Sequence, residues 1–414
     1  MEVEYIKGAP GLDGCRSCGS SDLEPILDLG VSPLADRLPT DPADDEYRCP
    51  LHAVFCKSCS LVQIVETVDP EILFYAEYPY FSSVSASLLE HTKQNVEEII
   101  ATRNLGPDHL VVELASNDGY LLQYYHRKGI RVLGIDPSEA PAKKAREAGI
   151  ETLITFFSHD AAKQLRADGI SADVIHGNNV LAHVADTNGF VAGIGEILGE
   201  DGIVVIEAPY VRDLIEKNEF DTIYHQHLCY FSVTAVDALF RRHGMYLNDV
   251  RRIPIHGGSL RLFFGKKENV QPSVRTVLAE ERQIGIDRPE FYRDFAERVR
   301  GFKKALLDLL QDLRSQGKRI AGYGAAAKGC TLINYVGIDR NLMEFIVDRN
   351  EYKQGKYMSG QLQPIRAPEY LLESMPDYVL ILPWNFADEI LRQQAEFRSR
   401  GGKFIVPLPE LKIV

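Results

Sequence analysis

The sequence predicts an α/β protein in which a small cysteine-rich N-terminal domain precedes two larger units of alternating strands and helices. Two observations carry this prediction. Two CxxC pairs lie in an N-terminal segment that is rich in proline, glycine and aspartate. Apolar runs typical of strands then alternate with helical stripes after residue 108, and again after residue 300. We expect domains at residues 1–70, 71–255 and 256–414.

The composition is that of an ordinary globular protein of two or three domains. The chain has 414 residues, of which 45% are hydrophobic and 25% charged. No apolar run reaches the roughly 18 residues of a membrane span, and the opening MEVEYIKGAP lacks the features of a signal peptide. A net charge of −13 without a basic run argues against nucleic acid as a partner. We therefore expect a cytoplasmic protein, most simply a monomer, that binds small molecules.

The cysteines give the first specific signal. Four of the seven form the pairs CRSC and CKSC, and two intervening residues let both thiolates of a pair reach one tetrahedral zinc ion. Redox CxxC motifs are the alternative, but these open a helix after a strand, and neither pair does so. A zinc ion with four sulfur ligands has no open position, so we expect a structural site. Its predicted ligands are Cys15, Cys18, Cys56 and Cys59.

The first alternating unit predicts a nucleoside-binding turn in the stretch VVELASNDGYLL. An acidic residue, Glu113, ends a strand, and the small residues Ala115 and Asn117 lead toward a helix. The next strand ends at Asp136 and Pro137, where an acid commonly accepts hydrogen bonds from ribose hydroxyls. The GxGxxG motif that a dinucleotide pyrophosphate needs is absent. A ligand without phosphates, S-adenosylmethionine, fits this pattern better.

Two further segments belong to the same expected site. ITFFS would place Phe156 and Phe157 over the adenine, and HGNN would place Asn178 and Asn179 beside the sulfonium. The alternative is a generic α/β sheet in which Asp136 only caps a helix.

The second unit opens with IAGYGAAAKGC, where Gly322 and Gly324 fill the first two positions of a dinucleotide turn and Asp348 ends the next strand. Taken alone, this turn is typical of an NAD site. Lys328 at the start of the helix instead favours a diphosphate, although basic residues here also suit a solvated face. The expected substrate-binding residues in this unit are Tyr323, Lys328, Arg349, Lys353 and Lys356.

Two short motifs remain. YHQHLCYFS carries two histidines among aromatic residues, which suits proton transfer better than an inert core; no carboxylates follow at the spacing of a metal site. HGGSLR offers Ser259 and Arg261 to a phosphate or sugar, and a β-turn with a structural arginine is an equal alternative.

Together these motifs resemble those of the sugar C-methyltransferases that act on nucleotide-linked 4-keto deoxysugars. The resemblance covers essentially the whole chain and is greatest to the C-3'-methyltransferases that make branched sugars such as tetronitrose for antibiotics. It implies methyl transfer from S-adenosylmethionine to C-3' of a dTDP-linked 4-keto-3-amino deoxysugar. It also implies that the nucleotide-sugar lies between the central and C-terminal domains.

The resemblance further implies roles for single residues. The C-3' proton lies next to a carbonyl, so a base can remove it to give an enolate. His227 would be this base, and Tyr224 would lie at the oxyanion or the sugar. The full expected catalytic set is Tyr78, His183, Tyr224, His225, Gln226 and His227.

Gln226 departs from the pattern of the family, which is Tyr-His-Glu-His. Glutamine keeps the size and the hydrogen bonding of glutamate but carries no charge, which predicts an engineered or impaired variant. Two other functions fit the sequence: a NAD-dependent oxidoreductase acting on a nucleotide-sugar, and a non-catalytic, zinc-containing nucleotide-binding protein.

Overall fold

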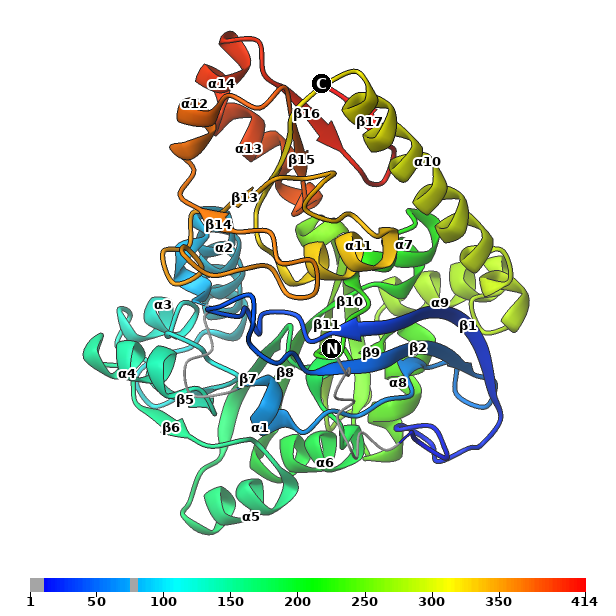
Figure 1. The fold of residues 1–414 in the computed structure, drawn as a ribbon. Helices are drawn as coiled ribbons and strands as arrows, with labels where there is room; N and C mark the ends of the chain where they lie inside the picture. Colours follow the sequence, from blue (N-terminus) through cyan, green and yellow to red (C-terminus); the bar gives the residue numbers. More distant parts are fainter. Residues whose placement is uncertain (1–10, 75–80) are drawn as a thin grey trace.

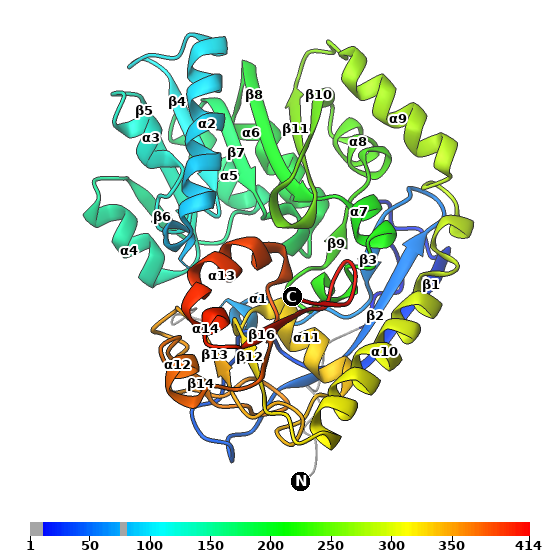
Figure 2. The same cartoon turned by 90° about the horizontal axis from the view of Figure 1, so that it is seen from above.

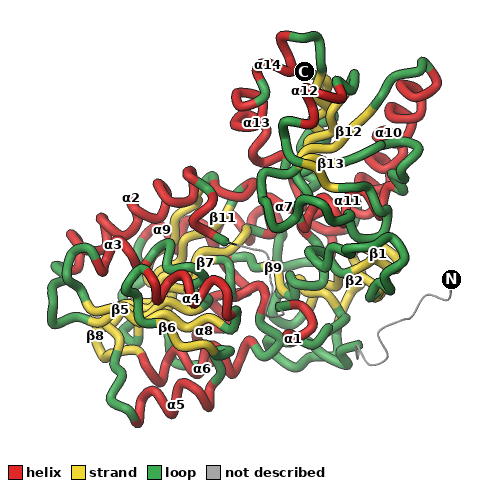
Figure 3. Tube along the Cα trace, turned by 60° about the vertical axis from the view of Figure 1, so that its left-hand side comes forward, coloured by secondary structure: helices red, strands yellow, loops and turns green. Residues whose placement is uncertain are grey.

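The computed structural model describes residues 11–74 and 81–414, and the strands in these residues form three sheets (Figure 1). Figure 3 shows the three sheets as separate groups of strands joined by helices and loops. The predicted organisation, a small N-terminal domain followed by two Rossmann-like α/β units, is confirmed.

The N-terminal sheet is antiparallel and has the order β1-β2-β3-β9. Its strands are β1 (Leu23–Pro33), β2 (Arg48–Cys56), β3 (Val62–Ile64) and β9 (Cys229–Tyr230), and α1 (Pro70–Leu73) follows β3. β9 comes from the middle of the chain and pairs with β3 through Val62 and Tyr230. The sheet therefore includes the residues that follow the YHQH motif directly.

The central sheet has the order β10-β11-β8-β7-β4-β5-β6. The five strands from β8 to β6 are parallel, whereas β11 runs antiparallel to β8 and to β10. Every residue of β4 is buried, because helices cover both faces of the sheet (Figure 2). The strands are β4 (Leu110–Leu114), β5 (Arg131–Asp136), β6 (Thr152–Ile154), β7 (Ala172–Asn178), β8 (Leu198–Pro209), β10 (Tyr246–Ile253) and β11 (Ser259–Gly265).

The strand order of the central sheet fixes where a ligand can bind. From β4 the chain first adds β5 and β6 on one side and then β7 and β8 on the other. Such a reversal leaves a crevice at the carboxyl ends of the strands, which is where open α/β sheets bind ligands. The helices of this unit are α2 (Ala86–Arg103), α3 (Leu122–His126), α4 (Glu139–Glu147), α5 (His159–Ala167), α6 (Thr187–Ile197), α7 (Val211–Glu216), α8 (Val233–Arg242) and α9 (Pro272–Ile284).

The C-terminal sheet has the order β14-β13-β12-β15-β16-β17 and is parallel except for β17. The long helix α10 leads into it and contacts both β1 and α11, so it also touches the N-terminal sheet (Figure 1). The elements are α10 (Phe295–Ser315), β12 (Ile320–Tyr323), α11 (Ala327–Val336), β13 (Ile346–Val347), β14 (Ile365–Arg366), α12 (Tyr370–Ser374), β15 (Tyr378–Ile381), α13 (Ala387–Gln393), α14 (Ala395–Ser399), β16 (Lys403–Val406) and β17 (Lys412–Ile413). None of the helices in the described ranges has the length and apolar character needed to cross a membrane.

The position of β11 differs from the expected division of the chain at residue 256. Ser259 pairs with Pro209 of β8, so the central sheet extends to Gly265. The expected boundary therefore separates β10 from β11, two paired strands of one sheet. The apolar sequence of β11 would suit a buried strand in either the central or the C-terminal sheet. Its pairing with β8 places it in the central sheet.

Candidate active site

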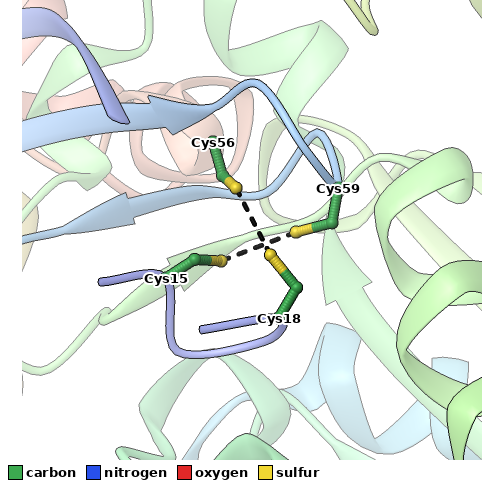
Figure 4. A group of neighbouring side chains, drawn as sticks. All are labelled: Cys15, Cys18, Cys56 and Cys59. Atoms are coloured by element: carbon green, nitrogen blue, oxygen red, sulfur yellow. Dashed lines mark hydrogen bonds between the residues drawn. The ribbon is translucent and has the colours of Figure 1, made fainter. Parts of the chain in front are cut away.

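The four cysteines of the CxxC pairs converge on one point (Figure 4). The Sγ atoms of Cys15 and Cys59 lie 3.5 Å apart, those of Cys18 and Cys56 lie 3.6 Å apart, and all four are within 4.8 Å of one another. A tetrahedral zinc ion with bonds of about 2.3 Å separates its sulfur ligands by roughly 3.8 Å. The predicted four-cysteine group therefore fits a zinc ion, which would have no free position for chemistry.

The loop of the first CxxC pair is fastened to the central unit. The backbone carbonyl of Arg16 accepts hydrogen bonds from Thr187 Oγ1 at 3.1 Å and Asn188 Nδ2 at 2.9 Å. Arg242 Nη2 donates to the carbonyl of Ser17 at 2.9 Å. Because these partners lie on or next to α6 and α8, the zinc loop is part of the framework of the central unit.

The turn after β4 has the shape of a ligand-binding turn without the usual glycines. Ala115 and Asn117 both adopt left-handed backbone conformations, with φ of 58° and 50°. Asp136 holds the turn, because its carboxylate accepts from the backbone N–H groups of Asn117 and Ser138, each at 2.8 Å. Asn117 Oδ1 in turn accepts from the backbone N–H of Ser82 at 2.8 Å, which ties the segment before α2 to the crevice.

Glu113 lies beneath this turn and not at the crevice surface. It is fully buried, and burial raises the pKa of its carboxyl well above the usual value, with further contributions from Asp136 and Asp118. A neutral carboxyl in this position supports the turn from below. Both carboxyl oxygens of Glu113 are buried without a hydrogen-bond partner among the described residues, and the expected contact with the cofactor stays a prediction.

The opposite side of the crevice offers polar atoms without protein partners. Asn178 is only 7% exposed, and both polar atoms of its amide lack a hydrogen-bond partner among the described residues. Asn179, with a φ of 53°, donates its backbone N–H to the carbonyl of Glu207. A buried amide with unmet hydrogen-bonding capacity suits a polar ligand, so these residues fit S-adenosylmethionine.

The two phenylalanines of ITFFS point to different surroundings. Phe156 is 41% exposed and remains available to stack on an adenine. Phe157 packs edge-to-face on Phe190 of α6, with ring centres 5.4 Å apart, and touches the core. Pro137 is half-buried between Asp136 and Ser138. Of the two expected adenine contacts, the structure places only Phe156 at the surface.

Tyr224 and His227 form a hydrogen-bonded pair. His227 Nδ1 lies 2.9 Å from the carbonyl oxygen of Thr222, an acceptor, so Nδ1 must carry the proton. The lone pair of His227 is therefore on Nε2, where it accepts the hydroxyl hydrogen of Tyr224 at 2.8 Å. The two rings lie with centres 4.0 Å apart. This arrangement places an imidazole nitrogen that carries a lone pair next to a hydroxyl donor.

His183 borders this pair. Its ring centre lies 4.7 Å from that of His227 and 5.8 Å from that of Phe74. Burial lowers the pKa of His183 to about 4, so the ring is neutral near pH 7. Tyr78, expected to close over the site, lies outside the described residues.

His225 is bonded to the N-terminal sheet, and the amide nitrogen of Gln226 lacks a partner among the described residues. His225 Nε2 donates to the carbonyl of Pro50 in β2 at 2.9 Å, and burial lowers the pKa of the ring. It therefore joins the loop to the N-terminal sheet. Gln226 is 2% exposed, and its Nε2 has no hydrogen-bond partner within the described ranges.

The basic residues of the C-terminal unit already have partners within the protein. Lys328 Nζ donates to Asn385 Oδ1 at 3.0 Å and lies 4.3 Å from the ring centre of Trp384. Lys353 Nζ donates to Asp36 Oδ1 and to the carbonyl of Ala325, both at 2.8 Å. Both lysines thus flank the turn after β12.

The remaining expected contacts of this unit are dispersed. Arg349 forms an exposed ion pair of 3.5 Å with Glu389, and Tyr323 is buried with Gln394 at 3.5 Å from its hydroxyl. Lys356 lines a cavity of about 220 Å³ against the loop between β1 and β2. Tyr323 ends β12 directly before the turn, and Arg349 follows Asp348, whose carboxylate accepts from the backbone N–H of Ala325 at 2.6 Å, so Lys356 lies farthest from the turn along the chain.

The geometry of HGGSLR agrees with the structural alternative. Arg261 Nε donates to Glu207 Oε1 at 2.6 Å, and His91 Nε2 lies 2.9 Å from the other oxygen of this buried carboxylate. Ser259 Oγ donates to the carbonyl of Ile255. Arg261 was expected at a phosphate, but β11 lies beside β8, which places its guanidinium against Glu207 in the central sheet.

Sequence reasoning did not single out Asp221, which lies just before the Tyr224–His227 pair in the chain, or Trp384, which is hydrogen-bonded to it. Asp221 is fully buried and accepts a 2.7 Å hydrogen bond from Trp384 Nε1. A signal was available, because Trp384 is the single tryptophan of the chain and Asp221 precedes YHQH by a few residues.

Three sequence families match the chain in succession. Residues 15–74 match a family described as a zinc binding domain, residues 88–249 a methyltransferase domain, and residues 254–409 the C-terminal domain of C-methyltransferases. The order agrees with the three sheets. Together with the crevice at the strand-order reversal, these matches define a methyltransferase that depends on S-adenosylmethionine and carries a zinc-binding domain.

A curated relative specifies the class further. The chain is 35% identical to the C-methyltransferase NovU of Streptomyces niveus over 408 residues, which cover 97% of each protein. The chain therefore belongs to the C-methyltransferase family.

Two solved methyltransferase structures are similar to part of the chain. Magnesium protoporphyrin IX methyltransferase (ChlM) from Synechocystis PCC 6803, with bound SAM, is 13% identical with a TM-score of 0.35, covering 45% of this chain and 82% of that one. A S-adenosylmethionine-dependent methyltransferase from Clostridium acetobutylicum is 10% identical with a TM-score of 0.36, covering 44% and 92%.

Proposed function

We propose that this C-methyltransferase transfers a methyl group to C-3' of a dTDP-linked 4-keto-3-amino deoxysugar, a step of antibiotic deoxysugar biosynthesis. The observation that carries the proposal is the Tyr224–His227 pair, in which a histidine lone pair and a phenolic hydroxyl lie together. Methylation at carbon needs a carbanion equivalent, and a proton next to a ketone is acidic enough for histidine to remove. S-adenosylmethionine, when bound, supplies the electrophilic methyl group.

His227 performs the proton transfer in this proposal. Its Nε2 takes the C-3' proton, and the electrons of the C–H bond move toward the C-4' oxygen as an enolate forms. The carbonyl of Thr222 stabilises the resulting imidazolium through the Nδ1–H bond. Tyr224, released from Nε2 by the arriving proton, donates its hydroxyl to the enolate oxygen. The enolate carbon C-3' would then bond to the methyl carbon as the methyl–sulfur bond breaks, with S-adenosylhomocysteine as the leaving group.

The surrounding residues have supporting roles. His183 is neutral near pH 7 and borders the sugar without competing for the proton. Lys328 and Lys353, on either side of the turn after β12, receive the diphosphate of the nucleotide-sugar, and Tyr323, Arg349 and Lys356 complete that surface. Asp136, Asn178 and Phe156 hold the nucleoside of the cofactor.

Solvent deuterium exchange at C-3' tests the proposal, because exchange reports proton removal without methyl transfer. The protein is incubated in D₂O with the dTDP-linked ketosugar and S-adenosylhomocysteine, and exchange is followed by NMR. We expect His227→Asn to abolish exchange. His159→Asn, which replaces a partly exposed histidine on α5, serves as control and should exchange at the normal rate. Unimpaired exchange in His227→Asn would remove His227 from the role of base.

Calorimetric titration distinguishes this function from an oxidoreductase. We expect binding of S-adenosylhomocysteine and of dTDP, and no binding of NAD⁺. The dinucleotide turn of the C-terminal unit favoured NAD⁺ as an alternative, so tight NAD⁺ binding there would contradict the assignment of that turn to the sugar nucleotide.

A further inference from the structure

The segment just before Tyr224 is held by the C-terminal unit. Residues Phe220–Thr222 form a single turn of 3₁₀ helix, which contacts α11. Asp221 in this turn has no exposed surface, and its Oδ2 accepts the indole N–H of Trp384 at 2.7 Å. A buried carboxylate that accepts a directed hydrogen bond is fixed in position more firmly than an exposed one.

A second hydrogen bond crosses the same boundary. Thr331 Oγ1 on α11 donates to the backbone carbonyl of Ile223 at 3.0 Å, and Thr331 is itself buried. Two residues of the central unit, Asp221 and Ile223, which flank Thr222, are thus bonded to the C-terminal unit. The residue between them is the one whose carbonyl accepts the Nδ1–H of His227.

Trp384 is anchored at its own end. It follows Pro383 at the carboxyl end of β15, and Gly324 lies so close that a Cβ there would meet the Pro383 ring at 2.5 Å. Lys328 Nζ lies 4.3 Å from the ring centre of Trp384 and faces the carboxylates of Asp221 and Glu219. The indole is therefore sandwiched between the turn after β12 and the buried acid.

We infer that Trp384, Asp221 and Thr331 are positioning residues for His227, through which the C-terminal unit sets the orientation and tautomer of the base. The path runs from the indole and the threonine hydroxyl to residues 221–223, and from the Thr222 carbonyl to Nδ1 of His227. If the carbonyl moves, Nδ1 loses its acceptor and the proton can move to Nε2, which leaves no lone pair toward the substrate. This inference deepens the proposed function and rests on it for the catalytic consequence, but the positioning of His227 can be measured without substrate.

Two substitutions remove one hydrogen bond each while keeping the shape. Trp384→Phe removes the indole N–H and keeps an aromatic ring, and Thr331→Val replaces the hydroxyl with a methyl group. Thr331→Ser retains the hydroxyl and is the matched control. Circular dichroism and the affinity for S-adenosylhomocysteine, whose crevice lies on the central sheet, establish that each variant is folded.

The first measurement is ¹⁵N NMR of the protein labelled at histidine, with the His227 signals assigned from His227→Asn. In the parent chain and in Thr331→Ser we expect a protonated Nδ1 and an unprotonated Nε2. In Trp384→Phe and Thr331→Val we expect a mixture of tautomers. Retention of the parent tautomer in both variants would overturn the inference, whatever the outcome for catalysis.

The second measurement is solvent exchange at C-3'. We expect exchange at saturating ketosugar to fall about 10- to 100-fold in Trp384→Phe and Thr331→Val, with little change in KM for the sugar nucleotide, because misplacing a base costs rate more than affinity. A raised KM with unchanged maximal rate would show instead that these residues bind substrate, and would overturn the inference. Failure of the proposed function would give a different result. His227→Asn would then still catalyse solvent exchange at C-3', while Trp384→Phe and Thr331→Val would still show a mixture of His227 tautomers.

Discussion

At the scale of single residues, Gln226 is the clearest conflict between the side chain and its surroundings. Its amide nitrogen is buried without a partner among the described residues, and an unpaired buried donor costs about 1–3 kcal/mol. A glutamate would present no donor there. It would also bring a negative charge into the loop that carries His227, which favours protonation of the histidine.

We therefore predict that Gln226→Glu raises the rate of methyl transfer, by roughly 100-fold if the charge assists proton removal as strongly as other acid–base groups do. The measurement is the initial rate of S-adenosylhomocysteine release with the ketosugar. Gln226→Asn is the control, since it shortens the side chain without adding charge, and should show no increase. Equal rates for the parent chain and the glutamate variant would identify glutamine as a competent residue here.

Glu219 gives a prediction about pH. Burial raises the pKa of its carboxyl to about 7, although Lys328 and Lys217 oppose the shift. The folded state thus binds this proton more tightly than the unfolded state, in which the carboxyl has its ordinary pKa of 4.5. The stabilisation from this group is complete below pH 4.5 and is lost as the pH rises to about 7.

Replacing Glu219 with glutamine should remove this dependence. We expect the thermal unfolding midpoint of Glu219→Gln to match that of the parent chain near pH 4.5 and to exceed it at pH 8, by an amount equivalent to about 2–3 kcal/mol. Melting curves followed by circular dichroism across this range provide the measurement. Parallel profiles for the two proteins would show that Glu219 is already ionised in the folded protein at low pH.

The sequence located single residues well where the motif is local. Asp136 and Asn117 lie in one turn because strand ends and the following residues are fixed by the alternation of strands and helices. It did not reveal the partners of Phe157, His225 and Arg261, because Phe190, Pro50 and Glu207 lie far away in the sequence. A short motif does not specify which distant strand or helix its side chains will contact.

At the scale of elements, the turn after β4 shows how a cofactor-binding turn forms without the glycines of a dinucleotide site. Ala115 adopts a φ of 58°, a conformation that costs an L-residue about 1–2 kcal/mol and that a β-branched residue adopts with greater difficulty. The small side chain is compatible with this strain, and the Asp136 hydrogen bonds to the turn offset it.

We predict that Ala115→Val weakens binding of S-adenosylhomocysteine by about tenfold or more, because the turn relaxes away from the left-handed conformation. Ala115→Gly relieves the strain and should bind with nearly unchanged affinity. Isothermal titration calorimetry measures both. Equal affinities for the valine and glycine variants would mean that the backbone conformation at residue 115 does not shape the crevice.

The sequence predicts long helices and strands better than short ones. The strands and helices of both alternating units carry clear periodic patterns, and their existence followed from those patterns. β9 consists of two residues, too short for any period, and its pairing with β3 depends on the whole N-terminal sheet being in place. The same limit applies to β11, which could have completed either neighbouring unit.

At the scale of the whole molecule, the three units meet at one loop. This loop comprises residues 220–230 and carries His227. The zinc-binding domain holds its second half, through the hydrogen bond from His225 to Pro50 and the pairing of β9 with β3. The C-terminal unit holds its beginning through Trp384 and Thr331. The cofactor crevice, by contrast, is formed by strands of the central sheet alone. A metal ion without an open position can therefore influence the chemistry by fixing the loop.

This arrangement predicts that loss of zinc separates catalysis from cofactor binding. Cys18→Ser removes one sulfur ligand and should lower the zinc content, because three remaining sulfurs hold the ion less tightly. We expect exchange at C-3' to fall at least tenfold, because β3 and Pro50 then hold the loop less firmly. The affinity for S-adenosylhomocysteine should change much less, because among the described residues the zinc loop contacts α6 and α8 and not the crevice turn. Cys49→Ser is the matched control, a buried cysteine of β2 outside the four-sulfur group, and should keep its zinc and its exchange. Metal analysis, calorimetry and exchange on the same samples decide the matter: if cofactor affinity collapses together with exchange, the zinc-binding domain supports the whole central unit and not the loop in particular.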